Sequence, residues 1–326
     1  MLFIKAISVA GLVLPFQVHC LSVFVHKSCS DRSNWNAYFE ESLNHARISV
    51  RRLDSASDTD FAAVFRRIFH TEKSSQTAAW ARDMMKRVAD LTITTDHKLS
   101  NIRIYCDNDS RFTAVVHGGI TKYLDRENMM ISKNQPSCLK QPPAEGRTYD
   151  RPTRNRSDGH NSHRVVITIC DALMNEPDSG TVPRRLEDLN GKDMHDTLVK
   201  DLDVLVSATM LHELVHAVSL DSAAERLEIL DQINPTNEAP DKYTAYGWDN
   251  IIEKDAETAI KNADNYAYLG IWASLADMGY TLPRLSEATD ATLLAEAESD
   301  AHRGILRRYA NITKRSLMGR MMRFFA

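Results

Sequence analysis

The feature that most constrains the fold is a nearly uncharged helical segment that carries two histidines and one glutamate. The segment TMLHELVHAV runs from Thr209 to Val218, and Glu213 is its one acidic residue. Apolar residues recur before and through it at helical spacing, at Leu202, Leu205, Val206, Met210, Leu214 and Val218. A helix with so few polar positions must be buried, so we expect it to begin near residue 201 or 203 and to cross the core.

The spacing of the two histidines indicates a metal site. Residues four apart on a helix lie one above the other, so His212 and His216 can direct their imidazoles at one cation. Glu213 lies beside the first ligand and can reach a water molecule on that cation without binding the metal itself. A pair of buried histidines satisfied by hydrogen bonds is the alternative. The motif and its uncharged flanks favour one Zn²⁺ per chain, with Glu213 as general base.

A third protein ligand must come from elsewhere in the chain. The extended pattern H-E-x-x-H-x-x-G-x-x-H is absent, because Ser219 replaces its glycine and Ser222 its last histidine. A glutamate on a following helix, Glu253 or Glu257, is one source of the ligand. A different zinc hydrolase with a glutamate ligand is therefore one alternative.

Three motifs together resemble the aspzincin metalloendopeptidases, the deuterolysin and lysine-specific group of fungal secreted proteins. They are HELVH, Tyr246-Gly247, and the run Asn262-Ala263-Asp264. The resemblance is strong from about Val165 to Ser274 and extends more weakly back to Cys29. It implies an α+β, zincin-like fold with mostly helical content, a small β-sheet and an active-site helix that carries HExxH. The activity implied is hydrolysis of peptide bonds in a protein or peptide substrate.

The resemblance also implies an aspartate as third ligand, but the chain departs from the family motif here. The aspartate would fall three residues before Tyr246, where Tyr243 stands. A longer loop could bring Asp241 to the metal instead, because loop length is tolerated more readily than ligand loss. We rank Asp241 first, then Asp231, then Asp249. A solvated turn residue is the alternative for each.

Two further residues receive roles from the resemblance. Tyr246 would donate a hydrogen bond to the oxyanion that forms during hydrolysis. A packed aromatic residue after a turn is the alternative. Asp264 would bind substrate by favouring basic side chains, and a helix-cap carboxylate is its alternative. The altered aspartate motif also leaves open a non-catalytic secreted interaction protein that kept the helix and lost the third ligand.

The N-terminus and the cysteines indicate secretion. Residues 1–20 read as a signal peptide, with Lys5 before an apolar stretch and cleavage after Cys20. In an oxidising compartment the remaining four cysteines most simply form two disulfides, with three pairings open. These residues are Cys29, Cys106, Cys138 and Cys170. Sequons at Asn108, Asn155 and Asn311 are compatible with an extracellular location.

The rest of the chain predicts one catalytic domain, 21–281, and a basic helical extension, 282–326. Helices are expected around Phe61, Val64, Phe65 and Ile68, and around Trp80, Met84, Val88 and Leu91, with those side chains in the core. Further helices are expected at 247–261 and 263–278, and strands at 101–106, 111–124 and 164–170. The proline-containing stretch 126–163 reads as a surface insertion that Cys138 tethers.

Charge and hydropathy limit the partners. A net charge of -4 argues against a broad nucleic-acid surface. After the signal no apolar run reaches the roughly 18 residues of a membrane span. We therefore expect a monomer that contacts neither nucleic acid nor, once the signal is removed, a membrane.

Overall fold

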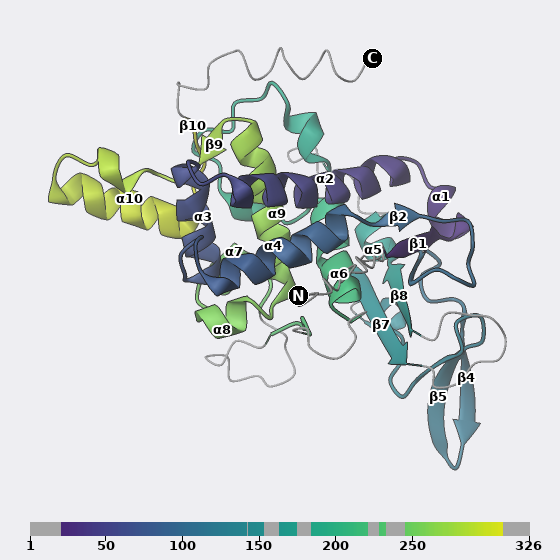
Figure 1. Ribbon diagram of the computed structural model, residues 1–326. Coiled ribbons are helices and arrows are strands. Elements are labelled where there is room, and N and C mark those ends of the chain that lie inside the picture. The colour runs from purple at the N-terminus through teal and green to yellow at the C-terminus, as the bar shows by residue number, and fades with distance from the viewer. Residues whose placement is uncertain are drawn as a thin grey trace, which may run out of the picture.

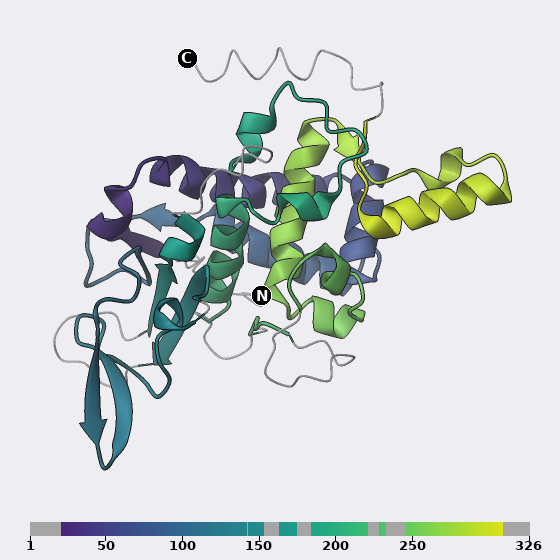
Figure 2. The same cartoon turned by 180° about the vertical axis from the view of Figure 1, so that it is seen from behind.

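The computed structural model describes residues 21–141, 143–152, 163–174, 184–220, 228–232 and 245–308 and has an α+β architecture (Figures 1 and 2). A mixed sheet lies beside a group of packed helices. The expected signal peptide lies outside the described residues. The helices are α1 (Lys27–Ser30), α2 (Trp35–Asp54), α3 (Thr59–Phe69), α4 (Gln76–Ala89), α5 (Asp171–Met174), α6 (Val206–Leu220), α7 (Trp248–Ile251), α8 (Ala256–Ala259), α9 (Ala263–Asp277) and α10 (Ala291–Arg303). In the described part of the chain no helix combines the length and apolarity needed to cross a bilayer.

The sheet has the strand order β2-β1-β3-β8-β7. The first four strands run parallel, and β7 pairs antiparallel with β8 at one edge. Their bounds are β1 (Ser22–Val25), β2 (Thr92–Ile93), β3 (Ile102–Tyr105), β7 (Gly146–Pro152) and β8 (His163–Ile169). Strands β3 and β8 were expected from their β-branched residues. Strand β7 falls within 126–163, so part of the expected surface insertion belongs to the main sheet.

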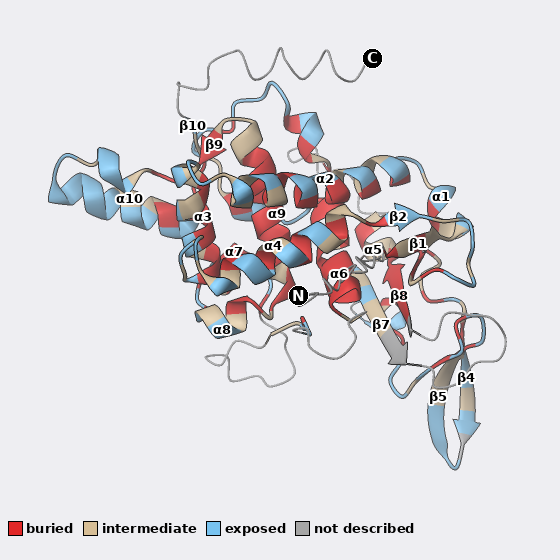
Figure 3. Cartoon of the chain, in the orientation of Figure 1, coloured by how far each residue is buried: buried red, intermediate tan, exposed pale blue. Residues whose placement is uncertain are grey.

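The single strand expected at 111–124 is instead a hairpin, which forms a separate sheet with the next strand. Strands β4 (Phe112–His117), β5 (Ile120–Asp125) and β6 (Met130–Ser132) pair antiparallel in this order. Gly118 and Gly119 form the β4–β5 turn, and both have positive φ. Residues with a Cβ adopt this conformation less readily than glycine. The hairpin projects from the body and is largely exposed (Figure 3).

Two disulfides connect these parts, as the even number of cysteines predicts. Cys29, in α1, bonds to Cys106, which directly follows β3. Cys138, in the 3₁₀ turn Ser137–Leu139, bonds to Cys170 at the end of β8. The second bond is the expected tether, and it closes a loop that contains β7.

Helices α3 and α4 begin where a capping side chain precedes an apolar stripe. The Asp58 side chain accepts a hydrogen bond from the Phe61 amide and starts α3, whose buried face holds the predicted core residues. The Ser75 hydroxyl caps α4 in the same way. The prediction for Trp80 is wrong, because it is 50% exposed. Trp80 precedes the buried Ala81 and therefore lies about 100° around the helix from the core-facing stripe.

Helices α6 and α9 pack against each other in the centre of the helical group and are buried almost throughout (Figure 3). Gly270 of α9 permits this approach: a Cβ there would overlap the Leu211 side chain of α6 and lie 3.0 Å from the His45 Cβ of α2. Helix α6 begins at Val206, after the 3₁₀ turn Val199–Leu202, slightly later than expected. The expected helix at 247–261 is two short ones, α7 and α8, whereas α9 matches the expected 263–278 closely.

A buried hydrogen-bond chain joins α2, α6 and α9. The Ser207 hydroxyl donates to Glu41 Oε1 at 2.6 Å, so it accepts from His45 Nε2 at 3.1 Å. Nδ1 of His45 then accepts from the Ser274 hydroxyl at 2.7 Å. Burial lowers the pKa of His45 from its usual 6.5, although Glu41 opposes the shift, and a neutral ring whose Nε2 donates leaves Nδ1 as an acceptor.

The C-terminal region contains α10, which extends from the body (Figure 1). Asp290 caps its first turn, and Gly304, with a φ of 70°, ends it. The chain then returns to pair β10 (Arg307–Arg308) with β9 (Tyr280–Thr281). Of the expected extension 282–326, the described part contains α10 and β10, and the rest of the basic tail lies outside the described residues.

Candidate metal centre

Helix α6 places both histidines of the HELVH motif on its buried side. Nε2 of His212 and Nε2 of His216 lie 3.0 Å apart. Asp231 completes a triangle with them, because its Oδ1 lies 3.0 Å from His212 Nε2 and 2.9 Å from His216 Nε2. These three residues form a group that could hold a metal ion. A point about 2.0–2.1 Å from all three atoms exists, which is the distance at which zinc binds imidazole nitrogen and carboxylate oxygen.

A hydrogen bond at Nδ1, the second ring nitrogen, orients each imidazole. His212 Nδ1 lies 3.2 Å from Asp264 Oδ1, and His216 Nδ1 lies 2.7 Å from the Ile229 carbonyl oxygen. Acceptors in these positions require protonated Nδ1 atoms and leave both Nε2 lone pairs directed at the common point. Metal-binding histidines are normally held in this way by a carboxylate or a carbonyl.

Asp231 is brought to the site by contacts between distant parts of the chain. Leu230 forms a parallel bridge with Asn262, immediately before α9. The buried Asn262 side chain accepts a hydrogen bond from the Gln232 amide at 3.1 Å and donates to the Ala245 carbonyl at 3.2 Å. Asn262 therefore holds the described residues on both sides of 233–244, and Asp231 lies between its anchored neighbours.

The charges of the group are strongly coupled. Burial opposes ionisation of Asp231, but hydrogen bonds from the two histidines outweigh it and lower the pKa of Asp231 well below its usual range. Burial likewise favours neutral His212, but the carboxylates of Asp231 and Asp264 outweigh it and raise the pKa of His212 well above 6.5. In a metal-free site a proton therefore balances the negative charge that a divalent cation would otherwise balance.

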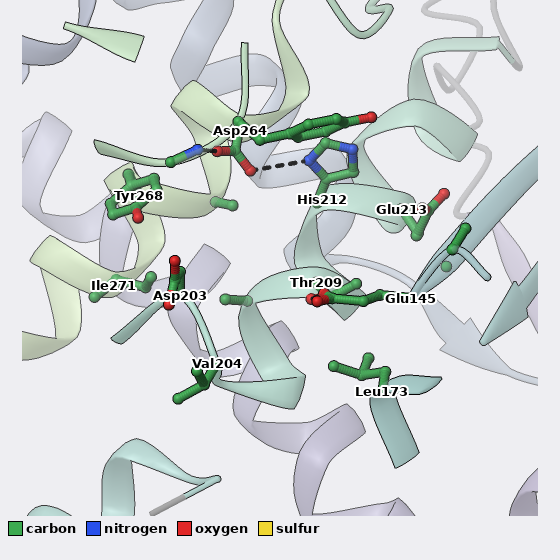
Figure 4. A pocket seen from close by; sticks show the side chains of 16 residues that line it. Glu145, Leu173, Asp203, Val204, Thr209, His212, Glu213, Asp264, Tyr268 and Ile271 are labelled. Atoms are coloured by element: carbon green, nitrogen blue, oxygen red, sulfur yellow. Dashed lines mark hydrogen bonds and ion pairs between the residues drawn. The ribbon is translucent and has the colours of Figure 1, made fainter. Parts of the chain in front are cut away.

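The other predicted site residues surround the same point. Glu213 is buried, and the ring of Tyr246 lies 5.6 Å from the ring of His212, with the two planes tilted by 43°. Desolvation and the nearby carboxylate of Asp231 raise the pKa of Tyr246, so its hydroxyl stays a proton donor. Asp264 binds His212 through one oxygen and accepts from the Gly247 amide, at 2.7 Å, through the other. Figure 4 shows Asp264 and Glu213 on opposite sides of His212.

The structure separates the candidates for the third ligand. Asp231, ranked second, lies in the group, whereas Asp241, ranked first, lies outside the described residues. Asp249 is exposed and pairs with Lys200 at 3.2 Å. Glu253 is also exposed, and the Glu257 side chain is 83% exposed and pairs with Lys261. Within the described chain, Asp231 is thus the carboxylate that joins the two histidines.

A pocket of about 480 Å³ opens beside His212 (Figure 4). Four carboxylates line it, and none of its described lining residues is a lysine or an arginine. Burial and the neighbouring Asp264 raise the pKa of Asp203. The carboxylates are Glu145, Asp203, Glu213 and Asp264, and the apolar part of the wall includes Leu173, Val204, Ala208, Ala267 and Ile271.

Strand β7 supplies residues that sequence reasoning did not identify. Thr148 Oγ1 lies 2.5 Å from Glu213 Oε2, and Arg147 places a guanidinium nitrogen 3.7 Å from Asp231 Oδ2. Gly146 lines the pocket next to Glu213. None of these residues lies in a recognisable motif. Their place beside Glu213 and Asp231 follows only from the pairing of β7 with β8.

Comparison of the chain with models of known protein families and with curated proteins gives no match to either. The resemblance to aspzincins therefore rests on the three motifs themselves.

Proposed function

We propose that this protein is a secreted, zinc-dependent endopeptidase with a zincin-like catalytic domain. The observation that supports it most directly is the triangle of His212 Nε2, His216 Nε2 and Asp231 Oδ1, with Glu213 on the same turn of helix. Two imidazoles and one carboxylate, with Nδ1 acceptors behind both rings, suit a catalytic zinc site, which keeps a further position open for water or substrate.

The proposed chemistry divides between the metal and the protein. Zinc, when bound, would act as a Lewis acid and make water acidic enough to lose a proton near neutral pH. Glu213 accepts that proton and returns it to the departing amine. Tyr246 donates to the oxyanion through a hydroxyl that remains protonated. Asp264 keeps His212 in the tautomer that leaves Nε2 free.

The substrate we propose is a protein or peptide with a basic side chain near the cut. The pocket combines apolar walls with carboxylates and lacks lysine and arginine among its described residues, which favours a cationic group on an apolar stem. Strand β7 is an edge strand next to Glu213, and an extended peptide can add to such an edge. Asp264 would contribute to this preference in addition to its bond to His212.

The two disulfides fit an oxidising compartment, which supports an extracellular location. A non-catalytic interaction protein on the same scaffold is the competing proposal, and it depends on loss of the third ligand. Asp231 supports the catalytic proposal over this alternative. We propose that the enzyme acts as a monomer without nucleic-acid or membrane partners.

The test measures zinc content and casein hydrolysis of the mature protein and of Glu213→Gln. We expect about one zinc per chain in both proteins, and a roughly 10²- to 10⁴-fold slower hydrolysis by the variant. Glu257→Gln, an exposed glutamate outside the site, is the matched control and should hydrolyse casein normally. Hydrolysis that survives Glu213→Gln would disprove the mechanism, and a zinc-free, inactive wild-type protein would favour the interaction protein.

The ligand assignment is tested in the same assay by Asp231→Asn. Loss of a direct ligand should weaken zinc binding by more than about 100-fold, beyond the usual cost of losing an outer-shell partner. Asp249→Asn, at an exposed aspartate, is the control. If Asp231→Asn retains zinc and Asp241→Asn loses it, the third ligand is Asp241.

A further inference from the structure

One short stretch of the edge strand β7 bounds the side chain of Glu213. The Thr148 hydroxyl oxygen lies 2.5 Å from Glu213 Oε2 and 3.1 Å from the Glu213 carbonyl oxygen. Gly146 lies two residues earlier and therefore on the same face of the strand. A Cβ added at Gly146 would lie 2.9 Å from Glu213 Oε1 and 3.0 Å from its Cγ.

These two contacts constrain the carboxylate in different ways. A hydroxyl that donates to a carboxylate makes a short, strong bond, so Thr148 fixes one oxygen. Gly146 leaves just enough room for the other oxygen and for the stem of the side chain. A free glutamate loses considerable rotamer entropy when it is ordered, and these contacts order Glu213 before any substrate arrives.

We infer that Gly146 and Thr148 are positioning residues that set the place of the Glu213 carboxylate beside the metal centre. The inference rests on the proposed role of Glu213 as general base. A base must lie within hydrogen-bond reach of the proton that it accepts, and a displacement of about 1 Å can cost roughly 100-fold in rate. The contacts described above for both residues are with Glu213, so both act through it.

The first test compares Thr148→Val, Thr148→Ser and Gly146→Ala. Valine keeps the shape of threonine without the hydroxyl, so we expect kcat to fall by about 100-fold while KM and zinc content stay unchanged. Serine restores the hydroxyl and should restore kcat to within a few fold. Gly146→Ala should lower kcat similarly, because the flexible end of Glu213 moves away from the new methyl group. Thr113→Val, at an exposed strand position of β4, is the matched control.

The second test uses metal-free protein and does not depend on activity. Thr148→Val should lower the melting temperature by roughly 2–4 °C in the wild-type background. In the Glu213→Ala background the same substitution should have a clearly smaller effect, because the carboxylate is gone and only the contact with the backbone carbonyl of residue 213 remains. Equal effects in both backgrounds, or wild-type kcat in Thr148→Val, would overturn the inference and leave the proposed function intact. An inactive wild-type protein would overturn the proposed function and the catalytic part of the inference together.

Discussion

At the scale of single residues, His45 shows how tightly the helices around the site depend on one neutral imidazole. It binds Ser207 of α6 and Ser274 of α9, and both bonds use the uncharged ring. Protonation would put a charge on a buried ring and would reverse the hydrogen bond with Ser274, whose hydroxyl would then have to accept. His45 therefore links the acidity of the medium to the packing of α6, which carries both histidine ligands of the proposed site.

We expect stability to fall as the pH drops below about 6.5, in part because of His45. Burial lowers its pKa in the folded protein, so the unfolded chain takes up a proton first when the pH falls through 6.5. The free energy of unfolding then decreases by up to about 1.4 kcal/mol per pH unit, until the folded-state pKa is reached.

His45→Gln removes this titration and is the variant to compare. Urea unfolding between pH 5 and pH 7 should show a less stable variant at pH 7 and a smaller difference from wild type at pH 5. Parallel pH profiles of the two proteins would show that His45 does not contribute.

At the scale of elements, the segment 228–232 and the start of α9 act as one unit. Asn262 is 1% exposed and satisfies the Gln232 amide and the Ala245 carbonyl, in addition to its bond to Asn265 Oδ1 at 2.7 Å. Asp231 has little secondary structure of its own to fix it. Its position therefore depends on a side chain that lies 31 residues further along the chain.

Asn262→Ala should consequently weaken zinc binding although Asn262 does not touch the proposed metal position. We expect a loss of roughly 10- to 100-fold in zinc affinity, as for other residues that orient a ligand. Val64→Ala, which removes core volume in α3, should lower stability without lowering zinc affinity. Equal zinc affinity in Asn262→Ala and wild type would contradict the proposed role of the asparagine.

At the scale of the whole molecule, the two disulfides stabilise different parts. The Cys29–Cys106 bond spans 77 residues and connects α1 to the central strand β3, and Cys138–Cys170 spans 32 residues around β7. By the entropy of loop closure, the first is worth roughly 4–5 kcal/mol and the second roughly 3–4 kcal/mol.

Paired serine substitutions separate the two bonds. Cys29→Ser with Cys106→Ser should lower the free energy of unfolding more, measured in urea on metal-free protein. Cys138→Ser with Cys170→Ser should cost less stability but should reduce casein hydrolysis more strongly, because β7 loses its tether. The opposite order of activities would show that β7 stays in place without the bond.

Sequence alone predicts much of this molecule where the signal is local. The stripe from Phe61 to Ile68, the buried HELVH helix and the pair of disulfides follow from periodicity, polarity and compartment. Trp80 was misplaced because a one-residue shift around a helix changes its environment completely. The sequence ranked Asp231 only second and did not single out Thr148, because the bridge from Leu230 to Asn262 and the register of β7 join residues that no spacing rule connects.

The bond between Cys138 and Cys170 links the proposed activity to the redox state of the protein. It closes the loop that carries Gly146 and Thr148, the two residues that we propose set Glu213 in place. Under the proposed function, reduction of this bond would release the strand that aligns the base. Cleavage would then depend on the same oxidising compartment that the two disulfides fit.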